Sequence, residues 1–131
     1  MYSKKDVSDS FSKHSSSYDK YADAQAKAAG FLVSFIRENS ADLPCGPVLE
    51  IGCGTGFVTR EIVPSMPDRK FLITDISGKM ADLCRNNLSM SGIDISSSIF
   101  AAFDGECSWP DKRFAMIYSG FTFQWFQDFV Q

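Results

Sequence analysis

The sequence has 131 residues, an apolar fraction of 44% and a formal net charge of −3, which is enough for one domain with an apolar core. Its pI near 5.0 and its interspersed charges exclude a general nucleic-acid binder, which would need a basic stripe. It has no C-x-x-C pair and a single histidine, so no metal site is predicted. No segment is apolar enough to span a membrane and the N-terminus is too polar for a signal peptide, so we expect a cytoplasmic protein without a membrane partner.

Residues 1–45 are expected to form an N-terminal arm and a helix. Residues 1–20 are rich in Ser, Lys and Asp, a composition typical of a mobile arm. From Tyr21 the sequence becomes alanine-rich and favours a helix. Its apolar residues at helical spacing predict one buried face, made of Ala28, Phe31, Leu32, Phe35 and Ile36.

Residues 46–131 alternate between apolar runs and segments with helical periodicity. The predicted elements are a strand at 48–51, a helix at 57–63, a strand at 70–75, a helix at 77–90, and strands at 97–104 and 113–119. Met80, Leu83, Cys84 and Leu88 are expected on the buried face of the second of these helices. This order predicts an α/β, Rossmann-like fold with a mostly parallel sheet and helices on both faces.

The first predicted strand runs into a glycine loop, "LEIGCGTGF", with Gly52, Gly54 and Gly56 at alternate positions. Such glycines let the backbone turn sharply and approach a ligand closely. The nicotinamide dinucleotide fingerprint, G-x-G-x-x-G/A, requires a small residue at position 57, where this sequence has Phe57. The spacing therefore counts against NAD.

The next two predicted strands each end in an acid. Asp75 lies about 20 residues after the glycine loop, where a carboxylate accepts hydrogen bonds from both ribose hydroxyls of an adenosine. Ile76 and Met80 are then expected against the adenine face, and Asp104 is expected to accept a hydrogen bond from the adenine amino group. Together these residues predict a cofactor that contains adenosine.

Over roughly residues 46–120 the sequence resembles the class I S-adenosylmethionine-dependent methyltransferases. Glu50-x-Gly52-x-Gly54-x-Gly56 resembles their first motif, and Asp75 and Asp104 resemble their ribose-binding and adenine-binding acids. The resemblance implies S-adenosyl-L-methionine as the cofactor. It also implies that the glycine loop contacts the methionine portion, with Glu50 beneath it.

Two further segments are similar to the malonyl-acyl-carrier-protein O-methyltransferases of biotin synthesis. They are "FSKHSSSYDKYADAQ" and "YSGFTFQWF", with matches at Phe11, Tyr18, Ala22, Gln25, Ser119, Gln124 and Trp125. The resemblance implies methylation of the free carboxylate of malonyl-acyl-carrier protein or malonyl-CoA. A carboxylate is ionised at neutral pH and needs no general base, so no catalytic side chain is assigned. Tyr18 is interpreted as a lid over the cofactor, and Ser119 as a residue facing the methyl group.

The candidate cofactor-binding residues are Tyr18, Glu50, Gly52, Cys53, Gly54, Gly56, Asp75, Ile76, Met80, Asp104, Gly105 and Ser119. Other interpretations stay open: Tyr18 as a surface aromatic, Glu50 as a cap for backbone amides, and Met80 as a core residue. The function has two alternatives, which are another small-molecule methyltransferase, acting on a quinone ring or a different acid, and a non-catalytic nucleotide-binding domain. The sequence ends soon after the fourth predicted strand, so we expect an incomplete sheet that self-associates through its exposed edge and lacks turnover by itself.

Overall fold

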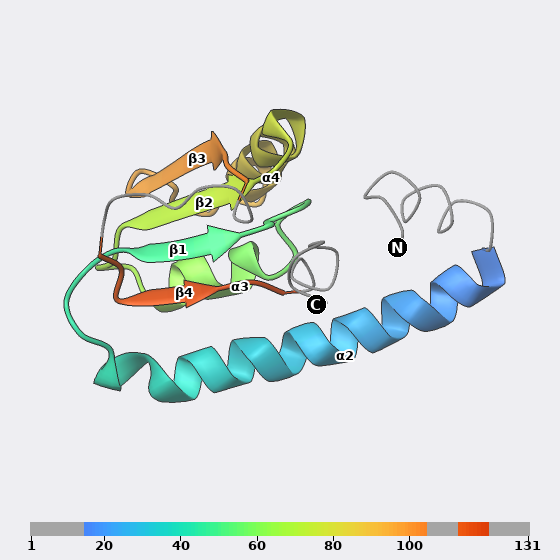
Figure 1. Ribbon diagram of the computed structural model, residues 1–131, viewed down its shortest axis with the longest axis horizontal. Helices are drawn as coiled ribbons and strands as arrows, with labels where there is room; N and C mark the ends of the chain where they lie inside the picture. The colour runs from blue at the N-terminus through green and yellow to red at the C-terminus, as the bar shows by residue number, and fades with distance from the viewer. Residues whose placement is uncertain (1–14, 105–112, 121–131) are drawn as a thin grey trace.

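The computed structural model describes residues 15–104 and 113–120, with the side chains of 15–22 outside that description (Figure 1). Its elements are α2 (Ser15–Asn39), η1 (Ser40–Asp42), β1 (Val48–Ile51), α3 (Thr59–Ser65), β2 (Phe71–Asp75), α4 (Gly78–Met90), β3 (Ser98–Ala102) and β4 (Met116–Tyr118). The strands form one parallel sheet in the order β3-β2-β1-β4. The prediction of an α/β Rossmann-like fold with a parallel sheet is confirmed. Within the described residues α2, α3 and α4 all pack on one face of the sheet, so helices on the other face stay a prediction.

The sheet forms because its two central strands are short runs of aliphatic residues that are buried on both sides. Val48, Leu49 and Ile51 of β1 are at most 1% exposed. Their register pairs Val48 with Phe71 and Ile51 with Thr74, so β1 and β2 end at the same edge of the sheet. Ligands of open parallel sheets bind outside this carboxyl edge, so the candidate site is expected there.

Helix α2 begins at Ser15, so residues 15–20 belong to the helix and not to an arm. Its predicted buried face is wrong in part. Ala28 is exposed, and Phe31 and Phe35 are 78% and 65% exposed, whereas Ile36 is buried as predicted. Ala29 and Val33, which were not predicted, are buried. A residue two positions further along a helix of about 3.6 residues per turn lies roughly 200° around the axis. The buried face of α2 therefore contains Ala29 and Val33, and Phe31 and Phe35 lie on the opposite, exposed face.

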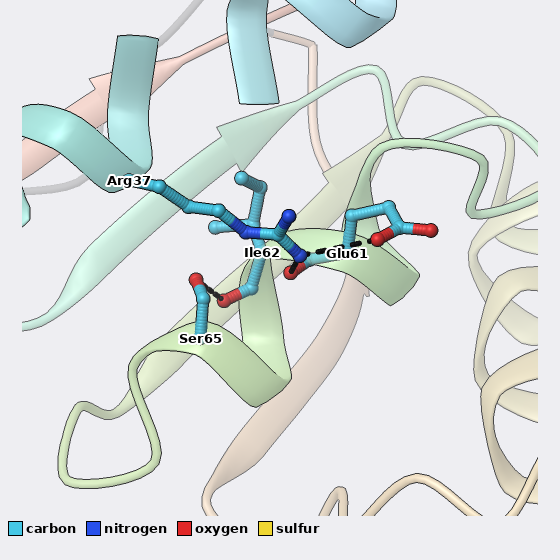
Figure 2. A network of polar contacts seen from close by, with 4 residues as sticks. All are labelled: Arg37, Glu61, Ile62 and Ser65. Atoms are coloured by element: carbon cyan, nitrogen blue, oxygen red, sulfur yellow. Dashed lines mark hydrogen bonds and ion pairs between the residues drawn. The ribbon is translucent and has the colours of Figure 1, made fainter. Parts of the chain in front are cut away.

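The C-terminal part of α2 packs against α3 through apolar and polar contacts. Figure 2 shows Arg37 extending from α2 to α3, where its Nη2 donates to the Glu61 carboxylate at 3.1 Å and to the Glu61 carbonyl oxygen at 3.2 Å. Both side chains are about half exposed, and such pairs contribute less than about 1 kcal/mol. The fully buried Ile62, next along α3, belongs to the same core cluster as Ala29 and Val33. The apolar contact is therefore the main attachment of α2.

All three described α-helices contribute to one core cluster, on the face of the sheet that carries Val48, Phe71 and Ile73. The opposite face carries a second, smaller cluster that is built around Leu49 and Ile51. The members of α4 buried in the first cluster or beside it are Ala81, Cys84 and Leu88, whereas Leu83, which was predicted to be buried, is 42% exposed. None of the helices within residues 15–104 and 113–120 has the length and apolar character needed to cross a membrane.

Candidate cofactor site

The glycine loop that follows β1 has three glycines with positive φ angles, 74° at Gly52, 56° at Gly54 and 95° at Gly56. Residues with a Cβ rarely adopt this conformation, so the local fold requires glycine. A Cβ on Gly56 would lie 2.8 Å from the Leu88 side chain and 3.0 Å from the Cys84 sulfur, whereas a Cβ on Gly54 would meet nothing within 4 Å. Gly56 thus packs the loop against α4, and Gly54 leaves open space for a ligand.

Asp75, the last residue of β2, ties this loop to the start of α4. Its Oδ2 accepts the backbone N–H of Gly54 at 2.9 Å, and its Oδ1 accepts the N–H of Ser77 at 3.0 Å. Ser77 in turn caps α4, because its Oγ accepts the N–H of Met80 at 3.3 Å. Asp75 is 8% exposed, and each carboxylate oxygen retains a further lone pair for a ligand hydroxyl.

Glu50 lies in β1 with its carboxyl group buried beneath the glycine loop, where the residue is 2% exposed. Thr59, at the start of α3, donates its hydroxyl to Glu50 Oε1 at 2.5 Å. Burial raises the pKa of the Glu50 carboxyl to about 7, against the lowering effects of the Thr59 and Tyr118 hydroxyls. The Tyr118 hydroxyl is buried near Glu50, yet it has no partner of standard hydrogen-bond geometry in the described part of the chain.

Cys53 lies in the loop with 6% exposure, and Cys84 lies behind it in α4. A hydrogen bond with Cys84, together with burial, raises the pKa of the Cys53 thiol well above its usual range. A protonated, buried thiol is a poor nucleophile, so Cys53 serves here as a small residue that fits the loop. Across the described ranges no group of three or more His, Cys, Asp or Glu side chains is arranged to hold a metal ion.

A pocket of about 230 Å³ lies at this carboxyl edge and brings four predicted residues together, namely Glu50, Gly52, Cys53 and Gly54. The other residues that line it are Gln25, Ala29, Thr55, Phe57, Val58 and Gly120. Gln25 and Ala29 come from α2, more than twenty positions before the loop. Apart from the match at Gln25, no sequence pattern predicts this long-range contact.

The remaining predicted residues lie around the same edge or outside the described ranges. Ile76 directly follows Asp75 and is 49% exposed, and the half-buried Met80 lies in the first turn of α4. Asp104 follows Phe103, whose N–H donates to the Asp75 carbonyl oxygen at 2.8 Å, so both acids lie at neighbouring strand ends.

Ser119 follows β4, and its buried hydroxyl has no hydrogen-bond partner within the ranges that the structure describes. Its neighbour Gly120 lines the pocket. Tyr18 lies in α2, but its side chain is outside the description, as is the whole of Gly105. The lid role of Tyr18 and the cofactor contact of Gly105 therefore stay predictions.

Residues 48–131 match the family described as a methyltransferase domain. The chain belongs to this family. The match confirms the predicted methyltransferase class and S-adenosylmethionine as the cofactor of that class. The matched segment starts at the first residue of β1 and so includes the glycine loop and both acids.

Curated relatives match nearly the whole chain. A malonyl-[acyl-carrier protein] O-methyltransferase from Acetivibrio thermocellus is 30% identical over 98% of this chain, and a protein of the same name, numbered 1, from Ilyobacter polytropus is 33% identical over 95%. The chain spans 43% and 44% of the lengths of these relatives, which is less than half. Among solved structures, an S-adenosylmethionine-dependent methyltransferase from Clostridium acetobutylicum shares the fold, with a TM-score of 0.56 and 23% identity over 83% of this chain and 43% of its own.

The site's own geometry fits S-adenosylmethionine. The Gly54 position leaves space for close backbone approach, and Asp75 offers acceptors for a ribose beside it. Glu50 supplies a carboxyl group to the pocket lining. Its ionised form is complementary in charge to the ammonium group at the amino-acid end of the cofactor.

Proposed function

We propose that this chain forms the S-adenosylmethionine-binding part of a methyltransferase that esterifies the free carboxylate of a malonyl thioester in biotin synthesis. The observation that carries the cofactor assignment is the Asp75 carboxylate, which contacts both the glycine loop and the start of α4. The substrate assignment rests on relatives of at least 30% identity that are named malonyl-[acyl-carrier protein] O-methyltransferases. The substrates are malonyl-acyl-carrier protein or malonyl-CoA, and the compartment is the cytoplasm.

S-adenosylmethionine supplies an electrophilic methyl group on a sulfonium centre when it is bound. In this proposal Asp75 accepts hydrogen bonds from the ribose hydroxyls, Asp104 contacts the adenine amino group, and the glycine loop surrounds the amino-acid end. The incoming malonyl carboxylate is already ionised at neutral pH, so the chain needs no general base. Its contribution is to orient the reactants and to exclude water from the pocket.

Two residues complete the proposal near the reacting groups. Ser119 has a buried hydroxyl and is next to the pocket residue Gly120. We propose that Ser119 faces the methyl group of the bound cofactor. Tyr18 is assigned to the lid, since α2 already contributes Gln25 and Ala29 to the pocket wall. The second candidate function, methylation of a quinone ring or another acid, shares the same cofactor site and differs only in the acceptor.

A methyl-transfer assay tests the acceptor. The full-length methyltransferase that contains this chain is used, because the chain by itself is expected to lack turnover. It is incubated with S-adenosylmethionine that carries a labelled methyl group, and with malonyl-CoA, acetyl-CoA or a quinol. The proposal predicts base-labile label on malonyl-CoA and none on acetyl-CoA, which is the matched control because it has the same thioester without the free carboxylate. Label on the quinol but not on malonyl-CoA would contradict the malonyl assignment and leave the cofactor assignment intact.

A further inference from the structure

A buried polar cluster lies directly behind the glycine loop and joins four elements of the fold. It consists of Glu50 in β1, Thr59 in α3, Cys84 in α4 and Tyr118 in β4. Thr59 is fully buried and is central to the cluster, because it donates to Glu50 Oε1 at 2.5 Å and receives the Cys84 thiol at 3.7 Å.

The cluster is costly for stability, since a buried carboxyl group needs an opposite charge or several donors to offset its lost hydration. No lysine or arginine in the described part of the chain forms an ion pair with Glu50. The ion pairs present there join Arg37 to Glu61 and Arg85 to Asp82, both at the surface. Glu50 is therefore supported by hydroxyl groups alone, and it lines the cofactor pocket without a cationic partner.

We propose that Thr59 is a positioning residue, whose hydroxyl orients the Glu50 carboxylate and favours its ionised form so that it receives the cationic ammonium group at the amino-acid end of the cofactor. The inference rests on the proposed cofactor. A hydroxyl that donates to an ionised carboxylate makes a charge-assisted hydrogen bond, which is about twice as strong as a neutral one. The bond to Oε1 also fixes the rotation of the carboxylate relative to the pocket.

The proposal predicts a specific pH dependence of cofactor binding. Glu50 is faced by Asp75 from β2, whose charge raises the Glu50 pKa, and by Tyr118 from β4, whose hydroxyl lowers it. The other titratable groups near Glu50 are the thiols of Cys53 and Cys84. Because burial brings the pKa of Glu50 to about 7, a cationic ligand binds more tightly as the pH rises through 7 and releases a proton on binding. Removal of the Thr59 hydroxyl moves this transition to higher pH.

The test is calorimetric titration of this chain with S-adenosylhomocysteine between pH 5.5 and 8.5, in two buffers of different ionisation enthalpy. Thr59→Val removes the hydroxyl at nearly constant shape, and Thr59→Ser is the matched control that retains it. Thr59→Val is expected to bind about ten-fold more weakly at pH 7 and to shift the transition up by about one pH unit, because a hydrogen bond to a charged group is of that order. Thr59→Ser is expected to follow the wild-type profile.

A Thr59→Val profile that superimposes on wild type would overturn the proposal. A loss of affinity that is equal at every pH would also overturn it, because it would indicate a packing role only. If circular dichroism shows that Thr59→Val is unfolded, Glu50→Gln provides the second test, and it must abolish proton release near pH 7. Proton release that persists in Glu50→Gln overturns the proposal. Absence of binding by the wild-type chain at any pH is a different result, which would refute the cofactor assignment itself.

Discussion

The stability of this fold is predicted to depend on pH through one buried group, Glu50. Burial raises its pKa from 4.5 to about 7, so the folded chain binds the proton more tightly than the unfolded chain does. Since one pKa unit corresponds to about 1.4 kcal/mol, the difference corresponds to about 3 kcal/mol. This contribution is fully present below pH 4.5 and is lost progressively as the pH rises through 7.

Glu50→Gln keeps the size of the side chain and cannot ionise, so it removes this loss. We expect the free energy of unfolding of the variant to lie within about 1 kcal/mol of wild type at pH 5, and to exceed it by about 3 kcal/mol at pH 8. Urea unfolding followed by circular dichroism at both values measures the difference. The same variant is expected to bind S-adenosylhomocysteine more weakly, so stability and binding change in opposite directions.

Glu61→Gln is the matched control, because Glu61 carries the same charge change at a half-exposed position on α3. Its ion pair with Arg37 is of the exposed kind, so the free energy of unfolding is expected to change by less than about 1 kcal/mol, with no large difference between pH 5 and pH 8. A Glu50→Gln variant that is destabilised more at pH 8 than at pH 5 would contradict this prediction, since it would mean that the ionised carboxylate stabilises the fold.

Three further substitutions separate stability from binding. Gly56→Ala is expected to lower the free energy of unfolding by about 1–3 kcal/mol in urea, because of its positive φ and close contacts, whereas the control Gly30→Ala in α2 is expected to raise it by up to about 1 kcal/mol. Arg69→Ala removes donors to three loop carbonyls and is expected to cost about 1–3 kcal/mol in the same assay while calorimetry shows unchanged cofactor affinity. Asp75→Ala is expected to weaken S-adenosylhomocysteine binding by roughly 100-fold in calorimetry, and the exposed Asp68→Ala by less than about two-fold. Equal effects within either matched pair, or an Arg69→Ala variant that loses affinity, would contradict these assignments.

The strands were predictable because their signal is local. The apolar runs around Val48 and Phe71 form β1 and β2 as expected, since strands buried on both faces of a parallel sheet consist of such runs. The buried face of α2 was not predictable, because two apolar stripes overlap on this helix. The stripe with Phe31 and Phe35 is more hydrophobic, yet the sheet and α3 cover the stripe with Ala29. Tertiary packing determines which of the two stripes is buried, and this choice cannot be predicted from the helical periodicity.

The candidate site also contains residues that could be predicted from the sequence and residues that could not. Asp75 was predictable from its spacing, because the glycine loop and the end of the next strand meet at one edge of a parallel sheet. Thr59 was not, because its hydrogen bond to Glu50 depends on how α3 returns across the loop after β1. Gln25 reaches the pocket only because α2 packs against the core cluster, a contact without a local sequence signal.

The most direct test of the central claim is calorimetric titration of the folded chain with S-adenosylhomocysteine, with NAD as the control ligand. We expect saturable binding of S-adenosylhomocysteine at one site and no binding of NAD, because Phe57 occupies the position that a dinucleotide loop requires to be small. A chain that is folded by circular dichroism and binds NAD, or that binds neither ligand, would contradict the assignment of the glycine loop to the methyl donor.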